Sequence, residues 1–197
     1  MEYLGGGPAA DLGELVRVWG VESTQPFSTS VKTYPCVQVN YQSPALTSFS
    51  RLTSTFAESM PVASADYDAE AAYAIWLNHY KIEVMIWVAN HGRIPAGNIL
   101  TRVKIGGQKY TIWQNGPDMF SFVLGGLPEP SGRVDLLSFF NWLSSFDYDV
   151  SAQLAHRFLT RSVMMTSVTF GWEIASTGDA TMDFSMQRYS LSSSLAN

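Results

Sequence analysis

The segment from residue 82 to residue 89 constrains the fold most, because its side chains alternate strictly in character. Successive side chains of a β-strand point to opposite faces. Glu83, Met85 and Trp87 therefore share one face of a predicted strand, and the opposite face is aliphatic. Such a strand buries one face in a core and displays a carboxylate beside an indole on the other. The aliphatic face consists of Ile82, Val84, Ile86 and Val88.

A second segment, from residue 168 to residue 175, repeats this design far along the chain. Glu173 stands among small or polar residues on one face of the predicted strand, opposite four large apolar side chains. The sequence therefore predicts two strands anchored in the core, each displaying one glutamate. The apolar face consists of Val168, Phe170, Trp172 and Ile174.

Short alternating segments and turn residues recur along the chain. Residues 73–77 and 181–187 alternate with period two, as half-buried strands do. One stretch, which Ser131 to Asp135 opens, instead has a helical period, and its apolar residues recur at i, i+3, i+4 and i+7. We predict a β-sandwich of two antiparallel sheets with one packed helix. The helical residues are Leu136, Phe139, Phe140 and Leu143, and the turn signals are Gly106-Gly107, Asn115-Gly116-Pro117 and Gly125-Gly126.

Length and composition limit the remaining possibilities. The 197 residues fit a single domain, and we expect only residues 1–15 and 190–197 to be poorly ordered. A net charge of -5 gives no electrostatic reason to bind nucleic acid or an anionic membrane. No apolar run approaches the roughly 20 residues that span a bilayer. Cys36 is the only cysteine, so it cannot form an internal disulfide.

Several motifs together resemble glycoside hydrolase family 12, the β-jelly-roll endoglucanases that cleave β-1,4-glucans with retention of configuration. The likeness extends from about Val16 onward, and the two glutamate segments carry most of it. The strongest matches are Glu83-Val84-Met85-Ile86-Trp87 before Pro95-Ala96-Gly97, Phe170-Gly171-Trp172-Glu173-Ile174, and Phe139-Phe140-Asn141-Trp142-Leu143. Weaker ones are Trp19-Gly20, Ser59-Met60-Pro61 and Gly107-Gln108 leading to Asn115-Gly116.

The resemblance implies an all-β jelly roll with a concave substrate cleft, and it assigns roles to residues. Glu83 resembles the nucleophile of the family and Glu173 resembles its acid/base. Sugar contacts are expected from Trp19, Met85, Trp87 and Asn115. The expected partner is a β-1,4-linked glucan, bound by a secreted monomer that needs no metal or cofactor.

The chemistry explains why two glutamates are required. A retaining glycosidase holds two carboxyl groups about 5 to 5.5 Å apart, one ionised to attack the anomeric carbon and one protonated to assist the leaving oxygen. Two strands of one curved sheet can present such a pair. Repulsion between the two carboxylates should raise the pKa of Glu173, and the pair should titrate as a unit.

The sequence departs from the family pattern at Ala74, where the family usually has an aspartate close to the nucleophile. We expect Ala74 to border solvent on the same face as Ala72 and Trp76. If that strand extends far enough back, Asp68 or Glu70 could supply the missing carboxyl group.

Two alternatives stay open at this point. The chain could be a catalytically impaired glucan-binding or wall-loosening module, or it could act on another polysaccharide such as xylan. A metal or triad site has less support, because His79, His91 and His156 lack ligand spacing and are expected in loops or on the surface.

Overall fold

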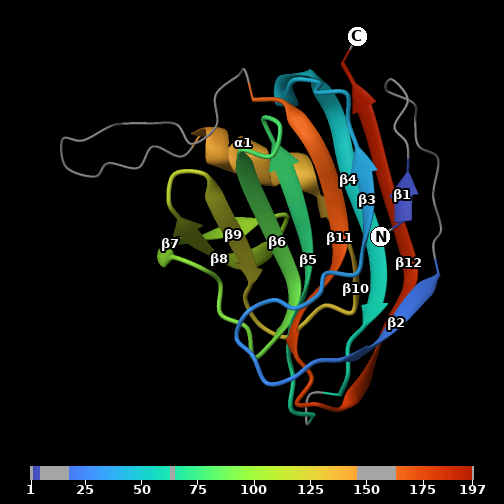
Figure 1. Cartoon of the computed structure of the whole chain (residues 1–197). Coiled ribbons are helices and arrows are strands. Elements are labelled where there is room, and N and C mark those ends of the chain that lie inside the picture. Colours follow the sequence, from blue (N-terminus) through green and yellow to red (C-terminus); the bar gives the residue numbers. More distant parts are fainter. Residues whose placement is uncertain (1, 5–17, 63–64, 146–162, 197) are drawn as a thin grey trace.

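Two β-sheets and one helix make up the computed structural model, which describes residues 2–4, 18–62, 65–145 and 163–196. Figure 1 shows the sheets as two layers, with α1 (Leu136–Ser145) beside them. A short 3₁₀ turn, η1 (Leu46–Ser48), precedes β4. The larger sheet has the order β1 (Glu2–Leu4), β3 (Cys36–Asn40), β11 (Met165–Ser176), β5 (Asp68–Leu77), β6 (Ile82–His91), β9 (Met119–Leu124), β8 (Gln108–Asn115) and β7 (Asn98–Ile105). The smaller sheet has the order β10 (Ser131–Asp135), β4 (Phe49–Ser59), β12 (Thr181–Leu195) and β2 (Trp19–Thr24).

The predicted β-sandwich is confirmed, with two changes of detail. Within the described chain, β1 pairs with β3 and β6 pairs with β9 in parallel, whereas the other pairs are antiparallel. The segment from Ser131 to Asp135, read as the opening of the helical pattern, is the strand β10, and the helix begins at Leu136.

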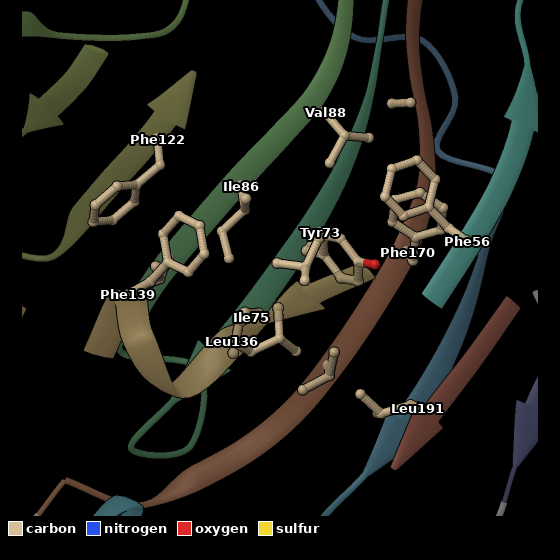
Figure 2. Packing of buried hydrophobic residues seen from close by; sticks show 14 of the residues in the cluster. Phe56, Tyr73, Ile75, Ile86, Val88, Phe122, Leu136, Phe139, Phe170 and Leu191 are labelled. Carbon is tan, nitrogen blue, oxygen red and sulfur yellow. The ribbon is translucent and has the colours of Figure 1, made fainter. Parts of the chain in front are cut away.

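The core between the sheets consists of the residues that the alternation placed there. Val84, Ile86 and Val88 of β6 are buried in it, and Ile82 packs against its edge. Figure 2 shows side chains from β4, β5, β6, β9, β11 and α1 converging in this layer. The apolar face predicted for residues 168–174 is also confirmed, because all four of its members are fully buried.

Four aromatic rings join the two sheets at the centre of the core. Tyr73 of β5 lies 4.4 Å from Phe170 of β11, measured between ring centroids, and Phe170 stacks on Tyr189 of β12 at 5.5 Å. Phe56 of β4 contacts Phe170 at 5.2 Å. Tyr73 also donates a 2.9 Å hydrogen bond to Oγ of Ser54, so its polar end is satisfied. We call these four rings the aromatic layer.

The helix α1 begins at a well-formed cap. Oδ1 of Asp135 accepts a hydrogen bond from the backbone N–H of Leu137, and Oδ2 accepts one from the hydroxyl of Ser138. An aspartate in this position satisfies N–H groups that have no partner inside the helix. The four apolar residues predicted for the helix are its buried ones, as expected for an amphipathic helix on a core.

The serine-rich end of the chain does not fray as expected, because β12 continues to Leu195. Its backbone pairs with β4 along this length, and the hydroxyls of Ser190 and Ser194 contact those of Thr55 and Ser50. Tyr189 and Leu191 are buried. The segment is thus a half-buried strand with small polar residues on its other face.

A β-bulge interrupts the pairing of β5 with β6. Ala71 lies opposite Ala89, but Ala72 lies opposite Trp87, so Val88 has no partner of its own. Both Val88 and Ala89 point into the core. The bulge reverses the alternation beyond it and places Asn90 on the same face as Trp87.

Glu58 is a buried carboxyl group inside the sandwich, near the end of β4. It accepts a 2.9 Å hydrogen bond from Nε1 of Trp172. Burial raises the pKa of Glu58 from its ordinary 4.5 to about 7, against the lowering effect of that bond. An acid whose pKa is raised in the folded state stabilises the protein below its unfolded pKa, and this contribution is lost as the pH rises toward 7.

As the pH rises from about 4.5 to about 8, we therefore expect the thermal stability of Glu58→Gln to fall less than that of the wild type. Glutamine cannot ionise, and its amide oxygen can still accept the bond from Trp172. One pKa unit corresponds to about 1.4 kcal/mol, so the full shift corresponds to roughly 3 kcal/mol of unfolding free energy. Thermal melts across this pH range measure the effect, with the exposed Glu22→Gln as control. Equal pH dependence in both variants would contradict the assignment.

Candidate active site

The face of the eight-stranded sheet that points away from the core, here called the outer face, carries the predicted site. Met85 and Trp87 of β6 lie on it and form a small apolar cluster with Ala72 of β5. Met119 and Val123 of β9 pack against this cluster from the neighbouring strand. Met85 is 2% exposed and Trp87 is 3% exposed. The two residues therefore form a closed floor rather than an exposed aromatic patch.

Glu83 lies on the outer face at one end of this cluster. Its neighbours in the sheet are Trp76 on β5 and Met119 on β9, and its backbone N–H donates to the carbonyl of Asp118. Burial raises the pKa of Glu83 to about 7, and repulsion from Glu173 adds to the rise. The charges of the two glutamates thus interact across the intervening strand β5.

Glu173 lies on the outer face at the other end of the cluster. It is half-buried and stands opposite Glu70 of β5, whereas Glu83 stands opposite Trp76. Figure 1 shows that β5, β6 and β11 are bent along their length. The sequence prediction that both glutamates leave the core on the same side of the sheet is confirmed by the core positions of their neighbours.

Glu70 was considered from the sequence only as a substitute for the missing aspartate. β5 does extend back to Asp68, and Glu70 is on the outer face, but its partner there is Glu173 rather than Glu83. Glu70 is completely buried, and Nε of Arg93 donates a 2.8 Å charged hydrogen bond to its Oε2. Burial and the adjacent carboxyl of Glu173 hold the pKa of Glu70 well above its ordinary value, against the lowering effect of Arg93.

Arg93 follows β6 and was not identified from the sequence. The side-chain amide of Asn90 bonds both the N–H and the carbonyl of Arg93, at 3.1 and 2.9 Å. Nη1 of Arg93 donates to the carbonyl of Thr29 at 2.6 Å. The guanidinium therefore ties the segment between β2 and β3 to the carboxyl groups of the sheet.

Asn115 lies in the same row of the sheet as Glu83. Its backbone pairs with Met119, which pairs in turn with Glu83, and its side-chain amide contacts the sulfur of Met119 at 3.7 Å. The backbone of Gly97 packs closely against β8 next to Asn115. A Cβ at Gly97 would lie 2.0 Å from the carbonyl oxygen of Gln114, so only glycine fits there. Asn115 is exposed beside the candidate site.

Trp19, predicted from the sequence as a sugar contact, lies apart from the outer-face cluster. It lies on β2 in the four-stranded sheet, and its ring packs against Trp172 of the core at 5.0 Å. Packing of this indole against the inter-sheet core explains the motif without any sugar contact. Trp19 is therefore left out of the candidate site.

Ala74 does not border solvent, and that expectation is wrong. It faces the same side as Ala72, as predicted, but it is only 2% exposed. Its neighbours are Met85 and Thr169, and the hydroxyl of Thr169 donates a 2.7 Å hydrogen bond to the carbonyl of Ala74. An aspartate at this position would therefore be buried and would carry a desolvation cost.

Tyr34 is a second residue that the sequence did not reveal. Its hydroxyl lies 3.1 Å from that of Thr169 and 3.3 Å from the carbonyl of Ala72, so the ring covers part of the outer face. Gly171 allows this approach, because a Cβ there would lie 2.1 Å from the carbonyl oxygen of Pro35. Burial raises the pKa of Tyr34 well above its ordinary value, and the charge of Glu173 contributes to the rise.

The turn between β5 and β6 places a further aromatic side chain near Glu83. Tyr80 is 54% exposed, and its ring lies 5.8 Å from that of Trp76, the neighbour of Glu83. Asn78, His79 and Tyr80 all have positive φ, between 49° and 65°. Non-glycine residues rarely adopt this conformation, and it costs free energy that the surrounding structure must supply.

The two histidines that the structure describes do not lie together. His79 lies in the turn just described, and His91 stacks on Tyr67 at 4.0 Å; His156 lies outside the described residues. Among the residues that the structure describes, no group of three or more histidine, cysteine, aspartate or glutamate side chains could hold a metal ion. No described helix is long and apolar enough to cross a membrane.

Comparisons with known proteins identify several solved structures of similar fold. The chain is 25% identical to the xyloglucanase domain of a type three effector from Sinorhizobium fredii, solved with cellobiose, at a TM-score of 0.75 over 89% of this chain and 83% of that one. It is 24% identical to endoglucanase 3 of Trichoderma harzianum, at a TM-score of 0.74 over 90% and 79%. The family 12 xyloglucanase of Bacillus licheniformis is 20% identical, at a TM-score of 0.70 over 93% and 83%.

No curated protein sequence matches the chain. The family model for glycosyl hydrolase family 12, in contrast, matches residues 17–194, which include both glutamate strands and the helix. A match of this extent, together with the jelly-roll architecture of the solved relatives, leads to one conclusion. The chain belongs to glycosyl hydrolase family 12.

Proposed function

We propose that the protein is a retaining endo-β-1,4-glucanase in which Glu83 is the nucleophile and Glu173 is the acid/base. The observation that supports this most is that the two glutamates lie on the outer face of one sheet and that the charge of Glu173 helps to raise the pKa of Glu83. Membership of a glycoside hydrolase family supports the reaction class. Neither residue is fully buried, so both are open to a substrate.

The proposed reaction has two displacement steps. In the first, the carboxylate of Glu83 forms a bond to the anomeric carbon, while the bond to the leaving oxygen breaks and that oxygen takes the proton of Glu173. In the second, a water gives a proton to Glu173 and its oxygen displaces Glu83 from the sugar. Two inversions restore the original configuration.

The environment of Glu83 sets a pH requirement for this mechanism. The nucleophile must be ionised, and burial raises the pKa of Glu83 to about 7. Its ionised fraction therefore grows as the pH rises toward 7, and we place the acidic limb of kcat/KM in that region. The acid/base must keep its proton over the same range.

The proposed substrate is a β-1,4-linked glucan chain. The Sinorhizobium fredii domain is a xyloglucanase solved with cellobiose, and the Trichoderma harzianum relative is an endoglucanase. Assays on carboxymethylcellulose, mixed-linkage β-glucan and xyloglucan separate the candidates. Because such polymers are substrates outside cells, we also propose a secreted enzyme that acts as a monomer.

A catalytically impaired glucan-binding module is the second candidate, favoured by one observation. Ala74 replaces a carboxyl group that the family pattern places near the nucleophile, and no space beside it is open to solvent. Release of reducing sugar separates the two candidates, because binding of glucan without release would support the module.

The role of Glu83 leads to the first functional prediction. We expect Glu83→Ala to abolish hydrolysis, because the glycosyl-enzyme can no longer form. Added azide should restore part of the turnover and give a product of inverted anomeric configuration, which NMR of the product identifies. Unimpaired turnover by Glu83→Ala would rule out the assignment.

The role of Glu173 leads to the second functional prediction. We expect Glu173→Gln to lower kcat by about 10²- to 10⁴-fold on substrates whose leaving group needs a proton. For aryl glycosides with acidic phenols as leaving groups, kcat should fall much less, since these phenols depart as anions without a proton. Kinetics on a series of leaving groups measures the difference, and equal losses across the series would show that Glu173 is not the acid.

The aromatic pair of Trp76 and Tyr80 beside Glu83 leads to the third functional prediction. If Tyr80 stacks on a sugar ring, Tyr80→Ala should raise KM several-fold, and Tyr80→Phe should keep the wild-type value because the ring remains. Tyr80 is largely exposed, so neither change should remove core packing. Kinetics on cello-oligosaccharides measure KM, and thermal melts of both variants show whether the fold is retained. An unchanged KM in Tyr80→Ala would exclude the contact.

A further inference from the structure

Glu70, which the proposed reaction does not use, forms a carboxyl pair with Glu173 on the outer face. They are direct partners in the ladder between β5 and β11. Side chains of such partners have Cβ atoms about 4.5 to 5.5 Å apart. Two carboxyl groups at this spacing cannot both ionise without strong repulsion, so the pair tends to retain a proton.

Burial separates the roles within this pair. Glu70 is completely buried and cannot reach an anomeric carbon, whereas Glu173 is half-buried. Oε2 of Glu70 accepts from Nε of Arg93, and its Oε1 is buried without a hydrogen-bond partner among the described residues. A buried carboxyl oxygen without a donor is costly unless a proton satisfies it.

We infer that Glu70 is a positioning residue for the proton of Glu173, that the two carboxyl groups share this proton, and that Arg93 holds Glu70 in place. The inference rests on the proposed role of Glu173 as acid/base. In the first step the shared proton leaves for the glycosidic oxygen, and in the second the pair regains one proton from the attacking water. Glu70 forms no bond to the sugar.

The pH at which the nucleophile ionises explains why the acid/base needs a partner that shares its proton. Glu83 ionises near pH 7, as its raised pKa indicates. A solvated glutamic acid with a pKa of about 4.3 would have lost its proton long before that pH. If Glu173 shares its proton with Glu70, both required protonation states can coexist.

Arg93 gives the pair its geometry. Its side chain is 12% exposed, and three contacts fix it: the carboxyl of Glu70, the carbonyl of Thr29 and the amide of Asn90 on its backbone. The other titratable or charged groups around the pair come from four elements. They are Glu83 on β6, Asp68 on β5, Cys36 on β3 and Tyr34 in the segment before β3.

Two measurements on Glu70→Gln test the inference. Glutamine preserves the size of the side chain and can donate to a Glu173 carboxylate, so the proton should be released at lower pH. We expect the alkaline limb of kcat/KM to move down by about one pH unit. We expect the NMR titration of the Glu173 carboxyl, followed with ¹³C-labelled glutamate, to move down equally. Glu70→Asp, which keeps the charge, should recover part of both shifts.

Asp68→Asn is the matched control, since it removes a carboxylate from the same strand and the same face. It should move both curves far less than Glu70→Gln does, because Asp68 is not the ladder partner of Glu173, and thermal melts show whether each variant folds. Superimposable titrations of Glu173 in wild type and Glu70→Gln would overturn the inference, even if hydrolysis occurs as proposed. A wild type without hydrolysis would instead contradict the proposed function, and the NMR titration would still decide whether the proton is shared.

Discussion

The aromatic layer between the sheets determines which side chains of β5 and β11 lie on the outer face. Tyr73 and Phe170 pack against Phe56 and Tyr189, and this contact determines which side of β5 and β11 points inward. Side chains alternate along a strand, so a slip of one residue would turn every outer side chain into the core. The burial of these rings is therefore what holds the carboxyl groups of the site in position.

The buried carboxyl groups of the protein are costly in free energy. Glu58, Glu70 and Glu83 all have raised pKa values, and burial is the main cause for each. Such groups reduce stability at neutral pH, because the folded protein resists the ionisation that the unfolded chain undergoes freely. The large apolar core offsets this cost, as is common where a functional site requires groups that the fold alone would not favour.

Alternation in the sequence predicted the two-layer fold, the helix and the faces of Glu83 and Glu173, because each depends on local periodicity. It did not predict which outer residues are neighbours, since pairing depends on register between distant strands. For that reason Glu70 was linked to the wrong glutamate and Ala74 was expected at the solvent. The packing of Trp19 against Trp172 was not foreseen, because its motif does not indicate the sheet to which its strand belongs. Tyr34 and Arg93 act from connecting segments, where no periodicity exists.

The bulge at Val88 links the pairing of β5 with β6 to the chemistry of the site. If β6 paired regularly beyond Trp87, without the bulge, Asn90 would turn toward the core, and its amide would no longer bond the backbone of Arg93. The guanidinium would then lose the support that holds it beside Glu70. Two relatives could thus share every glutamate and every aromatic residue and still differ in working pH, solely because this strand pairs without a bulge in one of them.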